Sequence, residues 1–201
     1  MNEIFALIDT ETNWFDEVMS IGMIIAEDNT YDVKEEYYGL ISPECYSGGM
    51  FSSVLRDNKA KIDIESTREQ IIKELKSILR KYHVRYIFAY NSSFDENHLP
   101  ELSDYLWIDI MKTTMYRQYN PFVPKYIDTY KTGKMMSNYG VESMLHMITG
   151  KVQNEVHNAL CDTRDELFIM KSFDMSMLRF VENNNKTSSQ RIKEYKDFMG
   201  I

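Results

Sequence analysis

The chain has few of the features that mark membrane, secreted or disulfide-bonded proteins. No apolar run approaches the roughly 20 residues that a membrane-spanning helix needs. The N-terminal segment lacks a basic stretch and a small-residue cleavage site, so we expect no signal peptide. The two cysteines, Cys45 and Cys161, are far apart in sequence, and we expect reduced thiols rather than a disulfide or a zinc site. Together these absences predict a cytoplasmic protein.

Excess positive charge is also missing. The 201 residues carry a formal net charge of -8, which argues against a non-specific nucleic-acid coat, since such proteins are usually basic. A nuclease is not excluded, because carboxylates that hold metal count as negative and bound cations offset part of that charge. The hydrophobic and charged fractions, 43% and 27%, are those of an ordinary globular protein, and the length suits one domain with a sizeable core.

Short apolar runs that alternate with helical patterns predict an α/β fold. Residues 4–8 are apolar without polar alternation, which is typical of a central strand buried on both faces. Asp28-Asn29 is a turn signal, so we expect the second and third strands to be antiparallel neighbours. The predicted strands cover 4–8, 18–26, 37–41, 86–90 and 106–109, the predicted helices cover 66–82, 94–102, 110–119, 137–147 and 158–173, and 42–64 and 120–137 are predicted loops.

Acidic residues and one histidine adjoin these apolar segments in three places. Asp9 and Glu11 end the first strand two residues apart, which places both side chains on one side of the sheet edge. Asp95 begins a helix five residues beyond the 86–90 strand. His157 precedes the last long helix, and Asp162 lies in its second turn. Because burying several like charges together is costly, a group of these acids predicts bound divalent cations.

Each segment taken alone also fits a purely structural interpretation. The segment 9–12 has the composition of an ordinary turn or helix cap. Asp95 is favoured electrostatically at a helix N-terminus whatever its function. Asn91 could orient a carboxylate or contact a phosphate, and it could equally form an Asx-turn. A lone loop histidine such as His157 is usually a surface residue. The agreement of the three segments is therefore the stronger evidence.

The order of these segments resembles the DEDDh exonucleases, the group of the proofreading subunit of DNA polymerase III and of ribonuclease T. The pattern is Asp-x-Glu, then Asn-x-x-Phe-Asp, then His-x-x-x-x-Asp, within residues 5–173. The resemblance implies a ribonuclease H-like fold with a mixed five-stranded sheet flanked by helices. Residues 1–182 would form the exonuclease domain, and 183–201 would be a polar linker and a C-terminal helix appended to it.

The resemblance also implies an enzyme, a metal-dependent 3′–5′ exonuclease that hydrolyses single-stranded DNA or RNA ends to nucleoside monophosphates. Asp9, Glu11, Asp95 and Asp162 would hold two divalent cations, Mg²⁺ or Mn²⁺, and His157 would be the general base. The alternative is a nuclease-like binding module that docks on a polymerase or an RNA-processing partner. Such a module would not need all of these residues, so the enzyme is the favoured interpretation.

One departure from the family pattern lies directly after the first acids. Many members have a glycine where this chain has Asn13-Trp14-Phe15, and that glycine gives a tight turn close to the substrate. The departure concerns the terminal-nucleotide pocket rather than the metal site. Trp14 or Phe15 could stack on a terminal base or pack on the core rim. The candidate substrate contacts are Thr10, Thr12, Trp14, Phe15, Asn91 and Phe94.

One long basic stretch with interleaved aromatic residues lies between 111 and 137. Cations for phosphates and aromatic rings for bases are what a single-strand groove uses. The competing interpretation is a solvated loop whose tyrosines cover the core. The cations are Lys112, Arg117, Lys125, Lys131 and Lys134, and the aromatic residues are Tyr116, Tyr119, Phe122, Tyr126 and Tyr130.

Overall fold

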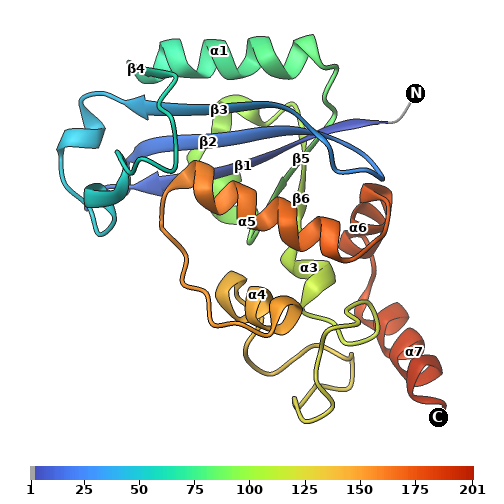
Figure 1. Cartoon of the computed structure of the whole chain (residues 1–201). Coiled ribbons are helices and arrows are strands. Elements are labelled where there is room, and N and C mark those ends of the chain that lie inside the picture. The colour runs from blue at the N-terminus through green and yellow to red at the C-terminus, as the bar shows by residue number, and fades with distance from the viewer. Residues whose placement is uncertain (1–2) are drawn as a thin grey trace.

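A mixed sheet with the strand order β4-β3-β2-β1-β5-β6 organises the molecule (Figure 1). The computed structural model describes residues 3–201, so Met1 and Asn2 of the segment tested for a signal peptide lie outside it. β1 pairs antiparallel with β2 and parallel with β5, and β2 pairs antiparallel with β3, as the turn signal predicts. The strands are β1 (Ile4–Thr12), β2 (Val18–Glu27), β3 (Val33–Ile41), β4 (Ile64–Ser66), β5 (Tyr86–Ala89) and β6 (Leu106–Asp109).

Helices cover both faces of this sheet and divide the core in two. α1 (Arg68–Lys81) and α5 (Ala159–Ser172) lie on opposite faces (Figure 1). In β1, Ala6 packs in the core under α1, whereas Phe5 and Leu7 pack in the core under α5. This alternation confirms the prediction that the first strand is buried on both faces. The other helices are α2 (Ser93–His98), α3 (Met111–Thr114), α4 (Val141–Thr149), α6 (Met177–Asn184) and α7 (Ser188–Met199), with short 3₁₀ turns at Glu44–Tyr46, Ser52–Val54 and Pro100–Leu102.

The predicted strand number was one too low. The sixth strand, β4, is a three-residue edge strand that pairs parallel with β3, with Gly39 opposite Ile64. Three residues are too few to produce a periodic pattern, and β4 forms because the edge of β3 offers unpaired backbone groups. The α/β class and the mixed sheet flanked by helices are confirmed.

Three predicted helices have different boundaries in the structure. The helix expected over 94–102 is divided into α2, which ends at His98, and the 3₁₀ turn Pro100–Leu102, since Pro100 lacks the N–H that a continuous α-helix needs. The helix expected over 110–119 ends at Thr114, because the Asn120 amide donates to the Thr114 carbonyl (2.6 Å) and the chain turns back. The helix expected over 137–147 begins at Val141, since Asn138 adopts a φ of 61° that is incompatible with a helix. α6 is an additional helix whose last residues occupy the start of the predicted polar linker.

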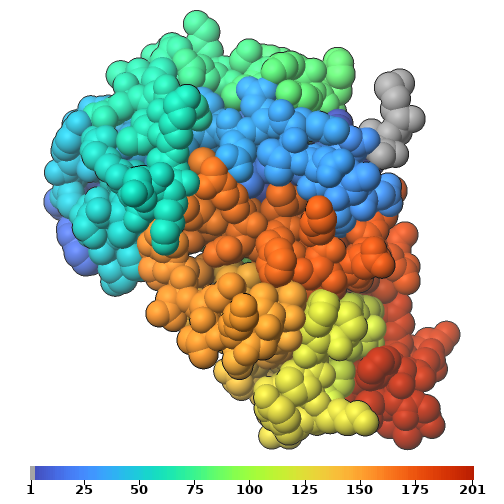
Figure 2. Space-filling view, in the orientation of Figure 1, coloured from blue at the N-terminus to red at the C-terminus, as the bar shows by residue number. Residues whose placement is uncertain are grey.

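The C-terminal helix α7 packs against the irregular segment before α4. The Thr129 and Tyr195 hydroxyls are 2.7 Å apart, and the Arg191 guanidinium lies 4.5 Å from the Tyr116 ring centroid. Figure 2 shows this segment and α7 side by side at the lower end of the molecule.

Both cysteines are free and buried. None of the helices within residues 3–201 has the length and apolar character to cross a membrane.

Candidate active site

A pocket of about 360 Å³ opens where β1 ends. Asp9 and Glu11 are two residues apart on β1, on the same side as Phe5 and Leu7, and therefore face α5. The turn after β1, the connection after β3, α2, the loop before α5 and α5 itself supply the rest of the wall. The lining residues are Asp9, Thr10, Glu11, Thr12, Asn13, Trp14, Met50, Phe51, Phe94, Glu155, His157 and Asp162.

The N-terminus of α5 reaches this pocket because β2 has no side chain in its way. A Cβ atom on Gly22 would lie 2.3 Å from the backbone of Ala159, so only glycine permits this approach. Asn158 then fixes the helix start. Its Oδ1 accepts from the Cys161 N–H (3.3 Å), and its Nδ2 donates to the Tyr38 hydroxyl (2.9 Å). These contacts hold Asp162 over the end of β1.

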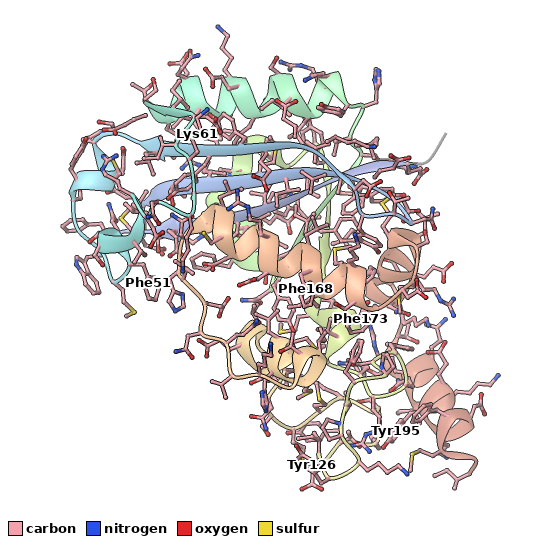
Figure 3. All side chains as sticks on the ribbon, viewed as in Figure 1. Phe51, Lys61, Tyr126, Phe168, Phe173 and Tyr195 are labelled. Atoms are coloured by element: carbon pink, nitrogen blue, oxygen red, sulfur yellow. The ribbon has the colours of Figure 1, made fainter. Side chains whose placement is uncertain are left out.

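Glu11, His157 and Asp162 come together in the pocket. One ligand atom from each lies within 4.8 Å of the others, a spacing that suits a bound metal ion. The His157 ring stacks on Phe51 with a centroid distance of 3.8 Å and an interplanar angle of 16° (Figure 3 labels Phe51). Phe51 belongs to the predicted loop 42–64, and no sequence pattern pointed to it. The stack orients the imidazole beside the two carboxylates.

Asp95 lies behind these three residues, at the start of α2. Its side chain is 2% exposed, and its Oδ1 accepts a hydrogen bond from the Thr10 hydroxyl at 2.8 Å. Thr10 lies between Asp9 and Glu11, so this bond ties the second acidic segment to the first. Asp9 is close enough to Asp95 for each charge to act on the other. Asp9 and Asp95 are not members of the compact group formed by Glu11, His157 and Asp162.

Mutual repulsion and burial shift the pKa values of these carboxyls upward. Burial, then the charge of Asp162, raises the pKa of Glu11 to about 9. Burial and the charge of Glu155 raise the pKa of Asp162 to about 7. Burial also raises the pKa of Asp95 to about 7 although Thr10 donates to it, and burial and Asp95 hold the pKa of Asp9 well above its usual range. These acids can all be ionised at neutral pH only if cations neutralise them.

Two further acids at the site were not predicted. Glu166 is 2% exposed, lies one helical turn after Asp162, and acts on Asp9 more strongly than Glu11 does. Its i, i+4 spacing from Asp162 was a usable signal in the sequence. Glu155 lines the pocket, and burial and the charge of Glu142 raise its pKa to about 7. Glu155 lies in an irregular loop, where spacing carries no information.

Unsatisfied oxygens indicate that the donor set fits a hard cation. Asp162 Oδ1 and Glu166 Oε2 are buried and have no hydrogen-bond partner within residues 3–201. Buried carboxylate oxygens nearly always have a donor or a cation. The oxygens of several carboxylates are suitable ligands for Mg²⁺ or Mn²⁺.

The predicted substrate contacts divide into two groups. Thr10, Thr12, Trp14 and Phe94 line the pocket, and Trp14 is 66% exposed. Phe15 and Asn91 are not among the lining residues. Phe15 is 72% exposed, and the Asn91 backbone N–H donates to Asp109 at 3.0 Å.

Asn13 forms the tight turn that directly follows the first acids. Its Oδ1 accepts from the Phe15 and Glu17 N–H groups at 2.8 and 3.0 Å, and its Nδ2 donates to the Glu17 carboxylate at 2.8 Å. This is the local hydrogen bonding by which an asparagine side chain stabilises a tight turn. Trp14 and Phe15 are exposed at the tip of that turn.

The basic and aromatic stretch is partly used inside the protein. The Arg117 guanidinium donates to the backbone carbonyls of Pro124 (3.1 Å) and Ile127, and the Tyr119 hydroxyl bonds to Glu194. None of residues 112–134 lines the pocket. Tyr126 is 81% exposed, and Figure 3 places it at the end of the molecule away from Phe51. Arg117 and Tyr119 therefore have partners within the protein, whereas Tyr126 is turned to solvent and does not cover the core.

Comparisons with solved structures identify the class of fold. The nuclease domain of 3′hExo, a DEDDh family member, bound to rAMP, matches with a TM-score of 0.61 and 16% identity, over 85% of this chain and 90% of that chain. A structure of 3′-end recognition of histone mRNA stem-loop by 3′-exonuclease matches with a TM-score of 0.61 and 15% identity, over 85% of this chain and 63% of that one. E. coli Exonuclease I in complex with a dA16 oligonucleotide matches with a TM-score of 0.53 and 14% identity, over 90% and 42% of the two chains.

The chain therefore has the ribonuclease H-like fold of the DEDDh 3′ exonucleases, as the resemblance of its motifs predicts. No protein-family model and no curated protein sequence matches it. At 14–16% identity the likeness to solved structures establishes the fold, and the chemistry must be argued from the pocket.

Proposed function

We propose that this chain is a metal-dependent 3′–5′ exonuclease that hydrolyses single-stranded DNA or RNA ends to nucleoside monophosphates. The observation that carries the proposal is the convergence of Glu11, His157 and Asp162 within 4.8 Å, with Asp9 and Asp95 adjacent. A binding module has no need for buried carboxylates whose mutual repulsion opposes folding. The fold shared with 3′ exonucleases supports the same conclusion.

The four acids of the sequence motif would hold the metal ions. Asp9, Glu11, Asp95 and Asp162 offer carboxylate oxygens, and the Thr10 hydroxyl fixes the orientation of the Asp95 carboxylate. Two Mg²⁺ or Mn²⁺ ions bound there supply positive charge at the attacking and leaving oxygens of a phosphodiester and acidify water.

His157 would act as the general base. Its ring nitrogen, held by the stack on Phe51, accepts the proton of the attacking water. The water oxygen bonds to the last phosphorus, the bond from that phosphorus to the preceding 3′ oxygen breaks, and that oxygen takes up a proton from solvent to become the new 3′-hydroxyl. The terminal nucleotide leaves as a monophosphate.

The rim of the pocket would bind the terminal nucleotide. Trp14 and Phe94 line the pocket and expose their rings, and aromatic side chains stack on bases of any sequence.

Residues 1–182 would carry this activity, and 183–201 would be an appendage of the same domain. The contact of Arg191 with Tyr116 supports that assignment.

Digestion of end-labelled oligonucleotides tests the proposal. Wild-type protein with Mg²⁺ or Mn²⁺ is expected to release labelled mononucleotide from a 3′-labelled single strand, and to shorten a 5′-labelled strand progressively. Asp9→Ala is expected to be slower by roughly 10³-fold, the equivalent of about 4 kcal/mol of lost transition-state stabilisation. If wild-type protein degrades the strand no faster than Asp9→Ala, the proposed activity is wrong.

A further inference from the structure

Glu166 occupies a position from which it can contribute to the acidic pocket. It lies on α5 four residues after Asp162, so both side chains project from the same face of the helix. Glu166 is 2% exposed, its charge acts on Asp9, and the charge of Asp95 acts on Glu166 in turn. A carboxylate this deeply buried needs compensation for its charge.

The two oxygens of Glu166 have different surroundings. Oε1 accepts the backbone N–H of Tyr90 at 2.8 Å. Tyr90 directly follows β5 and stands five residues before Asp95, so this bond fixes the segment that carries Asp95. Oε2 is buried and has no hydrogen-bond partner among the described residues. One oxygen thus has a structural role, and the other is left for a ligand.

We propose that Glu166 is a further carboxylate of the metal centre, and that its Oε2 faces a divalent cation held by Asp9 and Asp95. The inference rests on the proposed function, because it assigns Glu166 to the same centre. The hydrogen bond from the Tyr90 N–H does not by itself require a glutamate, since the amide oxygen of a glutamine would accept that N–H equally well. A charged oxygen without a donor is what a hard cation requires.

Mn²⁺ binding to the full chain, measured by calorimetric titration, tests this inference. Glu166→Gln keeps an acceptor for the Tyr90 N–H and replaces the charged Oε2 by a neutral NH₂ group, which cannot bind a cation. We expect it to bind Mn²⁺ at least about 10-fold more weakly than wild type, since a change in an outer partner of a metal site already costs about 10–100-fold and Glu166 is proposed to face the cation itself. Glu69→Gln is the matched control, because Glu69 is an exposed residue of α1 and its loss changes the net charge equally. Its affinity is expected to equal that of wild type.

The outcomes separate this inference from the proposed function. Wild-type protein that binds no Mn²⁺ contradicts both. Wild-type protein that binds Mn²⁺ while Glu166→Gln binds it equally well overturns only the role of Glu166. The role of Glu166 is also overturned if Glu166→Gln melts at a lower temperature without Mn²⁺ yet gains as much stability from Mn²⁺ as wild type. Should Glu166→Gln fail to fold, Glu166→Asp withdraws the carboxylate by one methylene, and unchanged affinity in that variant overturns the inference.

Discussion

Buried carboxylates have opposite surroundings at two places in this protein, at Asp28 and in the pocket. Asp28, at the far end of β2 from the pocket, is 4% exposed and fully hydrogen-bonded. Its Oδ1 accepts from the Asn29 and Met177 N–H groups at 2.8 and 2.7 Å, and its Oδ2 accepts from the Ser176 hydroxyl at 2.7 Å. Asp162 is 5% exposed, yet its Oδ1 has no partner among residues 3–201.

The difference distinguishes an acid that stabilises the fold from one that serves a ligand. Asp28 joins the β2–β3 turn to the start of α6, and donors occupy both of its oxygens. The acids in the pocket face one another instead, so their charged forms are disfavoured until a cation arrives. Burial alone does not separate the two groups, whereas the chemical identity of their neighbours does.

The largest expected effect is on catalysis and comes from His157. His157→Ala removes the proposed base, so the rate of oligonucleotide digestion should fall by about 10²–10⁴-fold. Mn²⁺ affinity measured by calorimetry should remain close to that of wild type. His83→Ala, at an exposed histidine, is the control and should keep full activity. An equal loss of Mn²⁺ affinity in His157→Ala would instead make His157 a metal ligand.

The second-largest expected effect is a change of melting temperature with pH in protein without divalent metal. In the folded chain the pKa values of Asp95 and Asp162 are raised to about 7, whereas in the unfolded chain an aspartate has a pKa near 4. Protonation of these two groups therefore makes its full contribution to the stability of the folded state below about pH 4. This contribution is lost as pH rises through about 7. Chelator-treated protein should therefore melt several degrees lower at alkaline than at mildly acidic pH. A melting temperature that rises over this range would contradict the shifted pKa values.

The smallest effect compares the two groups of acids directly by urea denaturation without metal. Asp28→Asn loses part of a satisfied hydrogen-bond set, and the free energy of unfolding should fall by about 1–3 kcal/mol. Asp162→Asn removes a repelled charge, so the free energy of unfolding should stay constant or rise. If both variants lose the same stability, the distinction between the groups is not valid.

The sequence is sufficient to predict those parts of the fold and of the site that follow from a local pattern of residues. The apolar run at 4–8 gave the central strand, and the spacing of apolar residues gave α1 and α5 within a residue or two. Asp9 and Glu11 share a side of β1 because strand geometry alternates. The order of the motifs led to the fold that the structural comparisons bear out.

Features that depend on tertiary contact could not be found in this way. β4 exists because β3 has a free edge, and Phe51 reaches His157 from a segment without any periodic pattern. α3 stops at Thr114, whose carbonyl accepts from the Asn120 side chain six residues further on, a contact that helical periodicity does not report. Glu166 differs from these features, since its i, i+4 spacing from Asp162 is a local pattern that the sequence displays.

The most direct test of the account is the melting temperature of the wild-type chain at about pH 8 with and without Mn²⁺. At a free concentration of about 100 times its Kd, Mn²⁺ should add about 2.7 kcal/mol of stability, which raises Tm by roughly 5–10 °C for a chain of this size. Asp9→Asn should lose most of that increase. No rise in the wild type, or an equal rise in Asp9→Asn, would show that the acids at the end of β1 do not form a metal centre.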